Sequence, residues 1–349
     1  MPNPLEQLLS LYQGCKVYHG EMHDHSNSGG TSDGKRTLAE WTEQLQNLHM
    51  DFAAILDHRQ VRHMYQPEWK DGLFIAGTEP GTHITDSKAS VNAMHYNILL
   101  PERDELASLL NEFPEYEFSG GIEGHFIYPT FTTERFGQLI DAIKAHGGLF
   151  VHPHPTLIMQ SDDPCDYWFR DETGIEVFYT DMASEATAKN YKLWTELLRA
   201  GKRVWACAGC DEHADASVGA LTTLYAEHQG NAAYLSHLRR GDFTCGPVGI
   251  RMCMGDTVSG GTCSFKEKTL IVAAGDFHES VVCPDHEYRI DILDDKGVVY
   301  SAPIKCDAMN CVVLPALDCS FYRAEVFDVT RKLRIAIGNP IWNQDRMNA

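Results

Sequence analysis

The stretch Gly20–Gly34, GEMHDHSNSGGTSDG, decides how the rest of this chain is interpreted. It places His23 and His25 two residues apart at the end of a predicted strand, residues 16–22. Because residues i and i+2 of a strand point to the same face, the two imidazoles are expected to project side by side. Imidazole, together with carboxylate, is a preferred ligand of divalent ions such as zinc, manganese and iron. The stretch therefore predicts a strand end that presents a pair of metal ligands.

Similar groups recur along the chain. Two more pairs lie two residues apart, His152 with His154 in GGLFVHPHP and Asp211 with His213 in ACAGCDEHA. One buried histidine is more simply a hydrogen-bonded core residue. Three such pairs beside apolar runs, with thirteen of the 17 histidines before residue 214, favour a metal centre instead. Ligands that follow short apolar strands are typical of the carboxyl-terminal strand ends of an α/β barrel.

In their order, these motifs resemble the PHP (polymerase and histidinol phosphatase) family of metal-dependent phosphoesterases, over residues 14–245. The matching residues are His23-x-His25, Ser32-Asp33-Gly34, Leu56-Asp57-His58, Gly77-Thr78-Glu79, His95, Val151-His152-Pro153, Gly174-Ile175-Glu176-Val177 and Asp211-x-His213. The resemblance implies an α/β fold, a distorted (β/α)7 TIM-like barrel. It also implies two or three divalent metal ions (Zn, Mn or Fe) at the carboxyl ends of the strands.

The resemblance and the metal chemistry together imply a role for each residue. The expected ligands are His23, His25, Glu79 and Asp211 for one ion, Asp33, His58 and His213 for a second, and His95 and His152 with Glu79 for a third. Asp57 and Glu176 are expected to orient ligands, and His154 to protonate the leaving group. His154 is an alternative to His152 as the ligand, and His83 an alternative to His95. The segment between His25 and Asp33 is longer than the family pattern.

The expected reaction is hydrolysis of a small phosphate ester by a metal-activated hydroxide. The same chemistry can attack a carbamate, ester or amide carbonyl, as the resemblance to CehA/McbA-like metallohydrolases suggests. A non-catalytic, metal-containing binding module is the third alternative. The net charge of -20 argues against a nucleic-acid polymer as a partner, because phosphate contacts need Lys and Arg. It does not exclude a small phosphate ester, since bound metal ions supply local positive charge.

The sequence pattern changes near Thr244-Cys245-Gly246-Pro247. Residues 14–245 alternate short apolar strands with amphipathic helices, which indicates a parallel α/β layout. Helices are expected at Thr37–Asn47, Glu134–Ala145 and Ala186–Ala200, and residues 101–130 are expected to form a loop that covers the site. Residues 246–349 are expected to form a separate β-sandwich that supplies no metal ligand. Its predicted strands are Leu270–Ala273, Tyr288–Leu293, Gly297–Tyr300, Cys311–Leu314, Tyr322–Asp328 and Leu333–Ile337.

Composition bears on where the protein works. The 11 cysteines form no regular framework, which predicts reduced thiols and a cytoplasmic location. Cys207-Ala-Gly-Cys210 matches CxxC, but Cys210 is more simply a small residue before Asp211. No apolar run reaches the 18 or more residues of a membrane span, and the first residues do not resemble a signal peptide. The expected partner is a small molecule, with no membrane, and the oligomeric state is left open.

Overall fold

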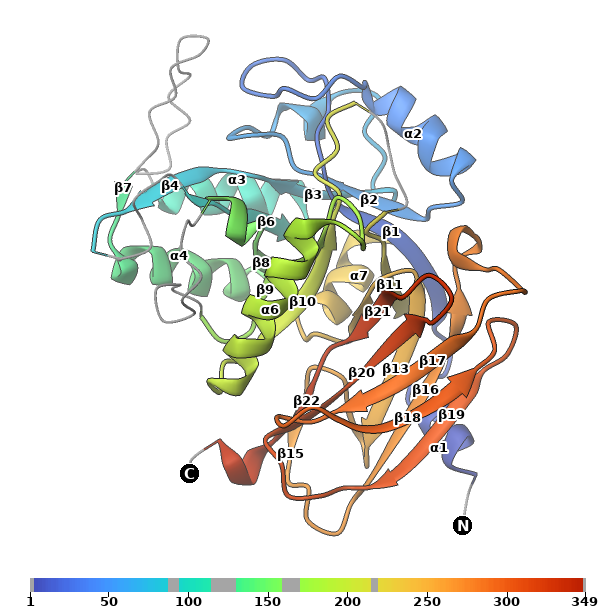
Figure 1. The fold of residues 1–349 in the computed structure, drawn as a ribbon. Coiled ribbons are helices and arrows are strands. Elements are labelled where there is room, and N and C mark those ends of the chain that lie inside the picture. Colours follow the sequence, from blue (N-terminus) through green and yellow to red (C-terminus); the bar gives the residue numbers. More distant parts are fainter. Residues whose placement is uncertain (1–2, 87–93, 114–129, 159–169, 215–218, 348–349) are drawn as a thin grey trace.

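The computed structural model describes residues 3–86, 94–113, 130–158, 170–214 and 219–347. Its largest sheet has 15 strands and runs through the whole molecule (Figure 1). Seven neighbouring strands at one end of this sheet lie in the order β10-β9-β8-β6-β3-β2-β1. Their bounds are β1 Lys16–Asp24, β2 Phe52–Ile55, β3 Phe74–Thr78, β6 Asn97–Leu100, β8 Leu149–His152, β9 Thr173–Tyr179 and β10 Val204–Gly209.

The carboxyl ends of the first and last of these seven strands meet. Asp211 N donates to His23 O at 2.7 Å, and His25 N donates to Glu212 O at 3.0 Å, so β1 and β10 are bonded just where the metal motifs lie. Four of the strand pairs are parallel, but β6 is antiparallel to both β3 and β8. The α/β class is confirmed, whereas the closed (β/α)7 barrel stays a prediction.

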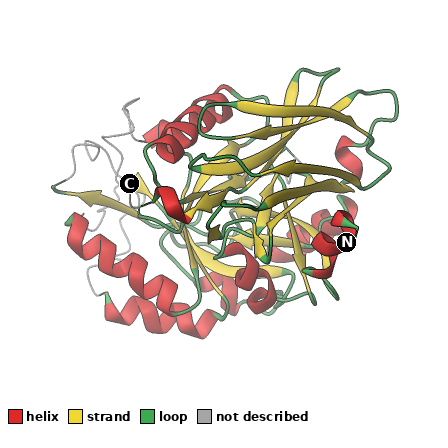
Figure 2. Cartoon of the chain, turned by 90° about the horizontal axis from the view of Figure 1, so that it is seen from below, coloured by secondary structure: helices red, strands yellow, loops and turns green. Residues whose placement is uncertain are grey.

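Helices lie along the outside of the strands, as the view from below shows (Figure 2). Those of the first 245 residues are α1 Pro4–Ser10, α2 Leu38–Asn47, α3 Arg103–Glu112, α4 Thr133–Ala145, α5 Pro155–Ile158, α6 Glu185–Arg199 and α7 Asn231–Leu238, with the 3-10 turn η1 Arg62–Tyr65. The helices α2, α4 and α6 begin and end within one residue of the predicted positions. Thr37 and Glu40 form the capping box that opens α2, which satisfies backbone N–H groups at its first turn. None of the described helices is long and apolar enough to cross a membrane.

The predicted loop at residues 101–130 is wrong over its first half. Residues 103–112 form α3, whose side chains Leu106 and Leu109 are fully buried in the core of the α/β part. The Pro, Gly and aromatic residues that suggested a loop lie outside this segment, whose sequence RDELASLLNE consists largely of helix-forming residues. Residues 114–129 lie outside the described residues, so a cover over the site stays a prediction. A separate three-stranded sheet, in the order β5-β4-β7, is formed by β4 Gly81–Ile84, β5 Met94–His95 and β7 Thr130–Phe131.

Residues beyond 246 are built of strands, as the sequence predicts. These are β13 Val248–Met254, β14 Thr257–Val258, β15 Thr262–Cys263, β16 Thr269–Phe277, β17 Tyr288–Leu293, β18 Val298–Ile304, β19 Asn310–Pro315, β20 Phe321–Asp328, β21 Leu333–Gly338 and β22 Ile341–Asn343, with the 3-10 turns η4 Glu279–Val281 and η5 Gln344–Arg346. A four-stranded sheet, β14-β13-β16-β19, and the run β21-β20-β17-β18 share a second hydrophobic core. Each of the six predicted strands overlaps an observed one.

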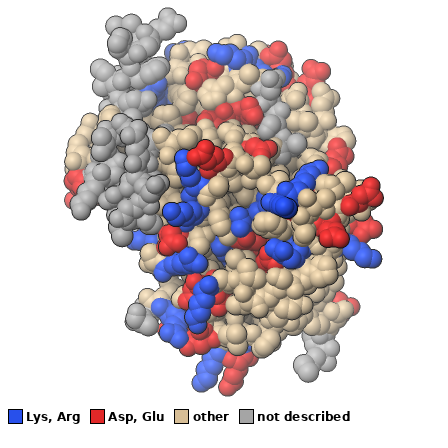
Figure 3. All heavy atoms as spheres, viewed as in Figure 1, with Lys and Arg blue, Asp and Glu red and all other residues tan. Residues whose placement is uncertain are grey.

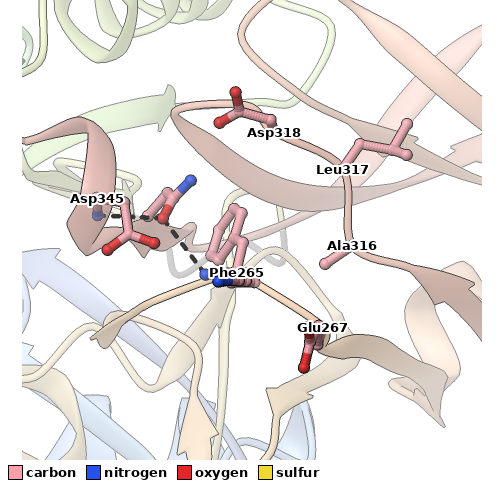
Figure 4. A pocket seen from close by; sticks show the side chains of 8 residues that line it. Phe265, Glu267, Ala316, Leu317, Asp318 and Asp345 are labelled. Carbon is pink, nitrogen blue, oxygen red and sulfur yellow. Dashed lines mark hydrogen bonds between the residues drawn. The ribbon is translucent and has the colours of Figure 1, made fainter.

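The large sheet crosses the predicted domain boundary. Strand β1 continues antiparallel into β11 Thr222–Ala226 and then β12 Phe243–Cys245, and β12 pairs with β21, Thr244 opposite Gly338. The backbone ladder is thus continuous between residues 14–245 and 246–349, and two separate domains stay a prediction. The C-terminal part also has an open pocket of about 340 Å³ lined by Phe265, Leu317 and Asp345, among others (Figure 4).

Candidate metal centre

The predicted ligands come from strand ends that the sheet brings together. His23 lies at the end of β1 and His25 directly after it, whereas His58 follows β2, Glu79 follows β3 and Asp211 follows β10. Three overlapping clusters result, each with ligand atoms within 4.8 Å of one another: His23, His25, Glu79 and Asp211; His25, Asp33, His58 and His213; and His58, Glu79 and His95. The first two contain the ligand sets expected from the sequence for two ions. All of their residues precede residue 214.

The Glu79 carboxylate is the middle of the centre. It is fully buried, and its Oε2 lies 3.3 Å from His23 Nε2, 3.4 Å from His25 Nε2 and 3.0 Å from His58 Nδ1. Its Oε1 lies 3.0 Å from His95 Nδ1 and 3.0 Å from His154 Nε2. Five imidazoles therefore converge on one carboxylate.

Asp211 and Asp33 complete the two ends of the centre. Asp211 Oδ1 lies 2.9 Å from His25 Nε2 and 3.5 Å from His23 Nε2. Asp33 Oδ1 lies 3.1 Å from His213 Nε2 and 3.6 Å from His58 Nε2, although the Asp33 side chain is 57% exposed. The long segment after His25 thus still returns Asp33 to the group, at its solvent edge.

The two histidines of the HPHP stretch lie in different surroundings. His154 turns Nε2 toward Glu79 and, at 3.9 Å, toward Asp211 Oδ2. The His152 ring packs edge-on against Phe150 at 4.8 Å between centroids, and burial lowers the pKa of His152 to about 3. Among the described residues, His152, His154 and His83 all lie outside the ligand clusters, although His154 Nε2 is 3.0 Å from Glu79 Oε1. His154 therefore lies beside Glu79, and the choice between His152 and His154 as the ligand stays a prediction.

Two further carboxylates, Glu176 and Asp57, contact the residues that carry or flank the predicted ligands. Glu176, on β9, lies 2.7 Å from His23 Nδ1 through Oε1, and its Oε2 accepts a hydrogen bond from His154 N at 2.7 Å. Asp57 accepts from Ser26 N at 2.6 Å and from the hydroxyl groups of Ser26 and Ser28. Glu176 therefore fixes the His23 ring and the backbone at His154, and Asp57 anchors the segment that follows His25.

Sequence reasoning missed Tyr179, which ends β9. Its hydroxyl donates to Asp211 Oδ2 at 2.7 Å, and its ring lies edge-on to His154. The nearest sequence signal is its place three residues after Glu176, at the end of the GIEVF strand. Asp211 and His154 have a left-handed backbone conformation, with φ of 56° and 28°, which residues other than glycine seldom adopt. Strain of this kind is concentrated at functional sites.

Burial and neighbouring charges both shift the pKa values of the residues in the centre. Burial raises the pKa of Glu79, but His23, His58 and His95 outweigh it and hold that pKa well below the usual range. Burial lowers the pKa of His25 to about 4. The hydrogen bond to Asp33 raises the pKa of His213 to about 9. At His23, His58 and His154 burial is outweighed by neighbouring carboxylates, which raise the pKa of each, so a divalent ion that bound here would displace protons from these imidazoles.

These residues fit divalent metal ions. Ligands bound to one zinc-like ion at about 2.0–2.2 Å lie roughly 3–3.5 Å from one another. The separations of 3.3–3.5 Å between Glu79 or Asp211 and His23, and between Glu79 and His25, fall in this range, and the 2.9 Å between Asp211 and His25 is slightly shorter. The donor set contains only imidazole and carboxylate groups, which suit zinc, manganese and iron.

No protein-family model and no curated protein matches the sequence. Solved structures similar to it include a two-domain protein from Bacteroides vulgatus that contains a predicted PHP-like metal-dependent phosphoesterase (14% identity, 91% of this chain and 92% of that one, TM-score 0.43). An amidohydrolase from Chromobacterium violaceum, solved with sulfate and no metal, is 16% identical over 56% of this chain and 87% of its own (TM-score 0.35). The lesion-specific endonuclease Q of Pyrococcus furiosus is 11% identical over 64% of this chain and 56% of its own (TM-score 0.43). The structural neighbours of this chain thus include a PHP-like metal-dependent phosphoesterase, the kind of protein its motifs resemble.

Proposed function

We propose that this chain is a metal-dependent hydrolase of the PHP type that cleaves a small phosphate ester. The observation that carries the proposal is the convergence of five imidazole nitrogens, each within 3.4 Å, on the buried carboxylate of Glu79. Five imidazoles this close together cannot all be protonated, because like charges in a buried site repel and disfavour the charged form. Divalent ions placed between these groups satisfy all of them.

Each ligand cluster is assigned to an ion in this proposal. His23, His25, Glu79 and Asp211 hold one ion, and Asp33, His58 and His213 hold its neighbour. His95 and Glu79 hold a third, with His154 in the ligand position in place of His152. Divalent ions bound there would act as Lewis acids and acidify water at neutral pH.

The surrounding residues position this chemistry. Glu176 fixes His23 through Nδ1, so that Nε2 faces Glu79 and Asp211. Tyr179 holds Asp211 Oδ2, which leaves Oδ1 facing His25. Asp57 fixes the start of the segment that carries Asp33. These contacts hold the ligands in position before substrate binds, so the ligands need not reorganise.

A small molecule is the proposed substrate, in preference to a nucleic acid. The chain has 49 acidic against 29 basic residues, and Lys and Arg side chains are interleaved with Asp and Glu on the face shown in Figure 3. A polymer of phosphates needs a continuous basic surface. Duplex and single-stranded DNA are accordingly expected not to compete with the small substrate at physiological salt.

The test is elemental analysis of protein purified without chelator, beside a substrate panel. We expect at least two divalent ions per chain and hydrolysis of phosphomonoesters or phosphodiesters. His25→Ala and Asp211→Asn should lose metal and turnover but still fold, with melting temperatures near that of the native protein in chelator, whereas His49→Gln, which replaces an exposed histidine, should change none of these. Fewer than one ion per chain, not recovered with Mn or Zn, contradicts the proposal. Cleavage of carbamates, esters or amides faster than phosphate esters would show that the protein is a carbonyl hydrolase and not a phosphoesterase.

A further inference from the structure

A second group of potential metal ligands lies at the opposite end of β1 from the centre. Cys15 precedes β1 and Glu227 follows β11, and these strands are antiparallel with Lys16 opposite Ala226. Cys15 and Glu227 therefore face each other one step beyond the last paired residues. His237 reaches the same place from the last turn of α7. The ligand atoms of Cys15, Glu227 and His237 lie within 4.8 Å of one another.

The imidazole of His237 is held in one orientation. Its Nδ1 lies 3.0 Å from Asp242 Oδ2, and its Nε2 lies 3.9 Å from Glu227 Oε2. The hydroxyl of Tyr12 donates to the other oxygen of Asp242 at 2.7 Å. His237, Asp242 and Tyr12 are 5–6% exposed, so this chain of contacts is shielded from water.

That arrangement matches how proteins prepare a metal-binding histidine. A carboxylate that accepts the N–H of one ring nitrogen fixes the tautomer and turns the lone pair of the other nitrogen outward. In this chain the outward nitrogen is Nε2, and it faces Cys15 and Glu227. Asp242 thus has the role of the orienting carboxylate, and Tyr12 holds Asp242.

We propose that Cys15, Glu227 and His237 form a second metal site, for zinc, separate from the histidine-rich centre. A thiolate, an imidazole and a carboxylate are a zinc ligand set, and water would take the fourth tetrahedral position. Ligand atoms of such a site lie roughly 3.4–3.8 Å apart, so side-chain rotations at Cys15 and at the 60%-exposed Glu227 suffice to close it. The nine residues of β1 separate the two sites by about 30 Å.

The rival reading is a reactive cysteine activated by His237 and Asp242. A nucleophilic cysteine needs a lowered pKa, but burial, Glu227 and Asp242 raise the pKa of Cys15. Two carboxylates beside a thiol are unfavourable for a free thiolate and favourable for a bound cation. The site would tie α7, β11 and the segment after α1 together.

Cobalt substitution tests the proposal, because a cobalt–thiolate bond gives a near-ultraviolet charge-transfer band that histidine and carboxylate ligands do not. The protein is stripped with chelator and refilled with cobalt. We expect the band in the native chain, in Cys311→Ser, which removes an exposed cysteine elsewhere, and in the double variant His23→Ala/His25→Ala. Cys15→Ser and His237→Gln should lack it and bind one ion fewer. Survival of the band in Cys15→Ser, or its loss in the double variant, would overturn the proposal.

Thiol protection gives an independent measurement. Added zinc should slow the reaction of Cys15 with a thiol reagent at least tenfold and leave Cys311 unchanged. Replacing Tyr12 by Phe should weaken that protection without removing a ligand. Equal reaction rates of Cys15 with and without zinc, in protein that melts normally, would show that no metal binds there.

Discussion

At the residue scale, the HPHP stretch shows how neighbouring side chains of one type acquire different surroundings. His154 has a left-handed backbone, and its N–H donates to Glu176, so its ring is turned toward Glu79. His152 keeps the strand conformation of β8 and packs against Phe150. The i, i+2 rule expects both rings on one face, and it fails here because the strand ends between them.

We therefore expect different results from two matched substitutions. His154→Gln should remove one bound ion and lower turnover at least a hundredfold, because Nε2 of His154 faces Glu79 directly. His152→Gln should keep the metal content and act on stability instead. Elemental analysis and turnover of both variants decide between them. If His154→Gln keeps all ions and fails only on substrates with poor leaving groups, His154 is the proton donor; if His152→Gln loses the ion, His152 is the ligand.

At the element scale, the junction of β10 with the centre depends on a glycine. A Cβ at Gly209 would collide with the carboxylate of Glu176 and lie 2.9 Å from His23 Cβ. Gly209→Ala should therefore displace Glu176, release His23 and lower metal affinity by roughly 10–100-fold, the usual cost of disturbing an orienting group.

Gly174→Ala is the matched control, because its Cβ would meet Cys207 Sγ at 2.6 Å and Val151 in the core instead. Overpacking of this kind costs about 1–3 kcal/mol of stability. We expect that variant to melt earlier with normal metal stoichiometry. Metal titrations and thermal melts of both proteins separate the two effects, and equal metal affinity of Gly209→Ala and the native chain would contradict the role given to Gly209.

The contact between β1 and η4 predicts a pH dependence. Burial, and next the charge of His278, lower the pKa of His19 to about 4, whereas an unfolded histidine titrates near 6.5. Between these values the unfolded chain binds the proton more readily, so this stability is present above pH 6.5 and lost as pH falls toward 4. The loss amounts to about 3 kcal/mol at most.

Urea unfolding of metal-free protein at several pH values measures this loss. His19→Gln should flatten the decline by up to that amount, while His49→Gln, whose native side chain is 65% exposed, should leave the profile unchanged. Identical pH profiles for the native chain and His19→Gln would show that His19 does not contribute.

Elements were predictable from sequence where their signal is local. The capping box of Thr37 and Glu40 begins α2, and alternating side chains mark β17 and β20. The antiparallel setting of β6 and the placement of Tyr179 beside Asp211 depend on contacts between distant segments. The helix α3 was missed because the Pro, Gly and aromatic residues on either side of it were averaged with its own helix-forming sequence, RDELASLLNE. Within the centre, the ligand types followed from spacing, but the choice between His152 and His154 depends on backbone dihedral angles that no spacing encodes.

At the scale of the whole molecule, metal ions should stabilise the fold. Ions that bind only the folded chain add about 3–4 kcal/mol each when free metal is present at 100–1,000 times Kd. Chelator should therefore lower the melting temperature by several degrees, and zinc or manganese should restore it. Asp211→Asn should respond less to chelator than the native protein. A melting temperature that chelator leaves unchanged would contradict ion binding at the buried ligands.

The pairing of β12 with β21 has a consequence for synthesis on the ribosome. Thr244 pairs with Gly338, which follows 94 positions later, so the edge of β12 stays bare until the distant strand has been made. At about 5–20 residues per second this interval lasts roughly 5–20 s. An uncovered strand edge has unpaired N–H and C=O groups that can form hydrogen bonds with a strand of another chain. The nascent protein should therefore depend on chaperones during that interval, and a chain that stops at residue 245 should be prone to aggregate.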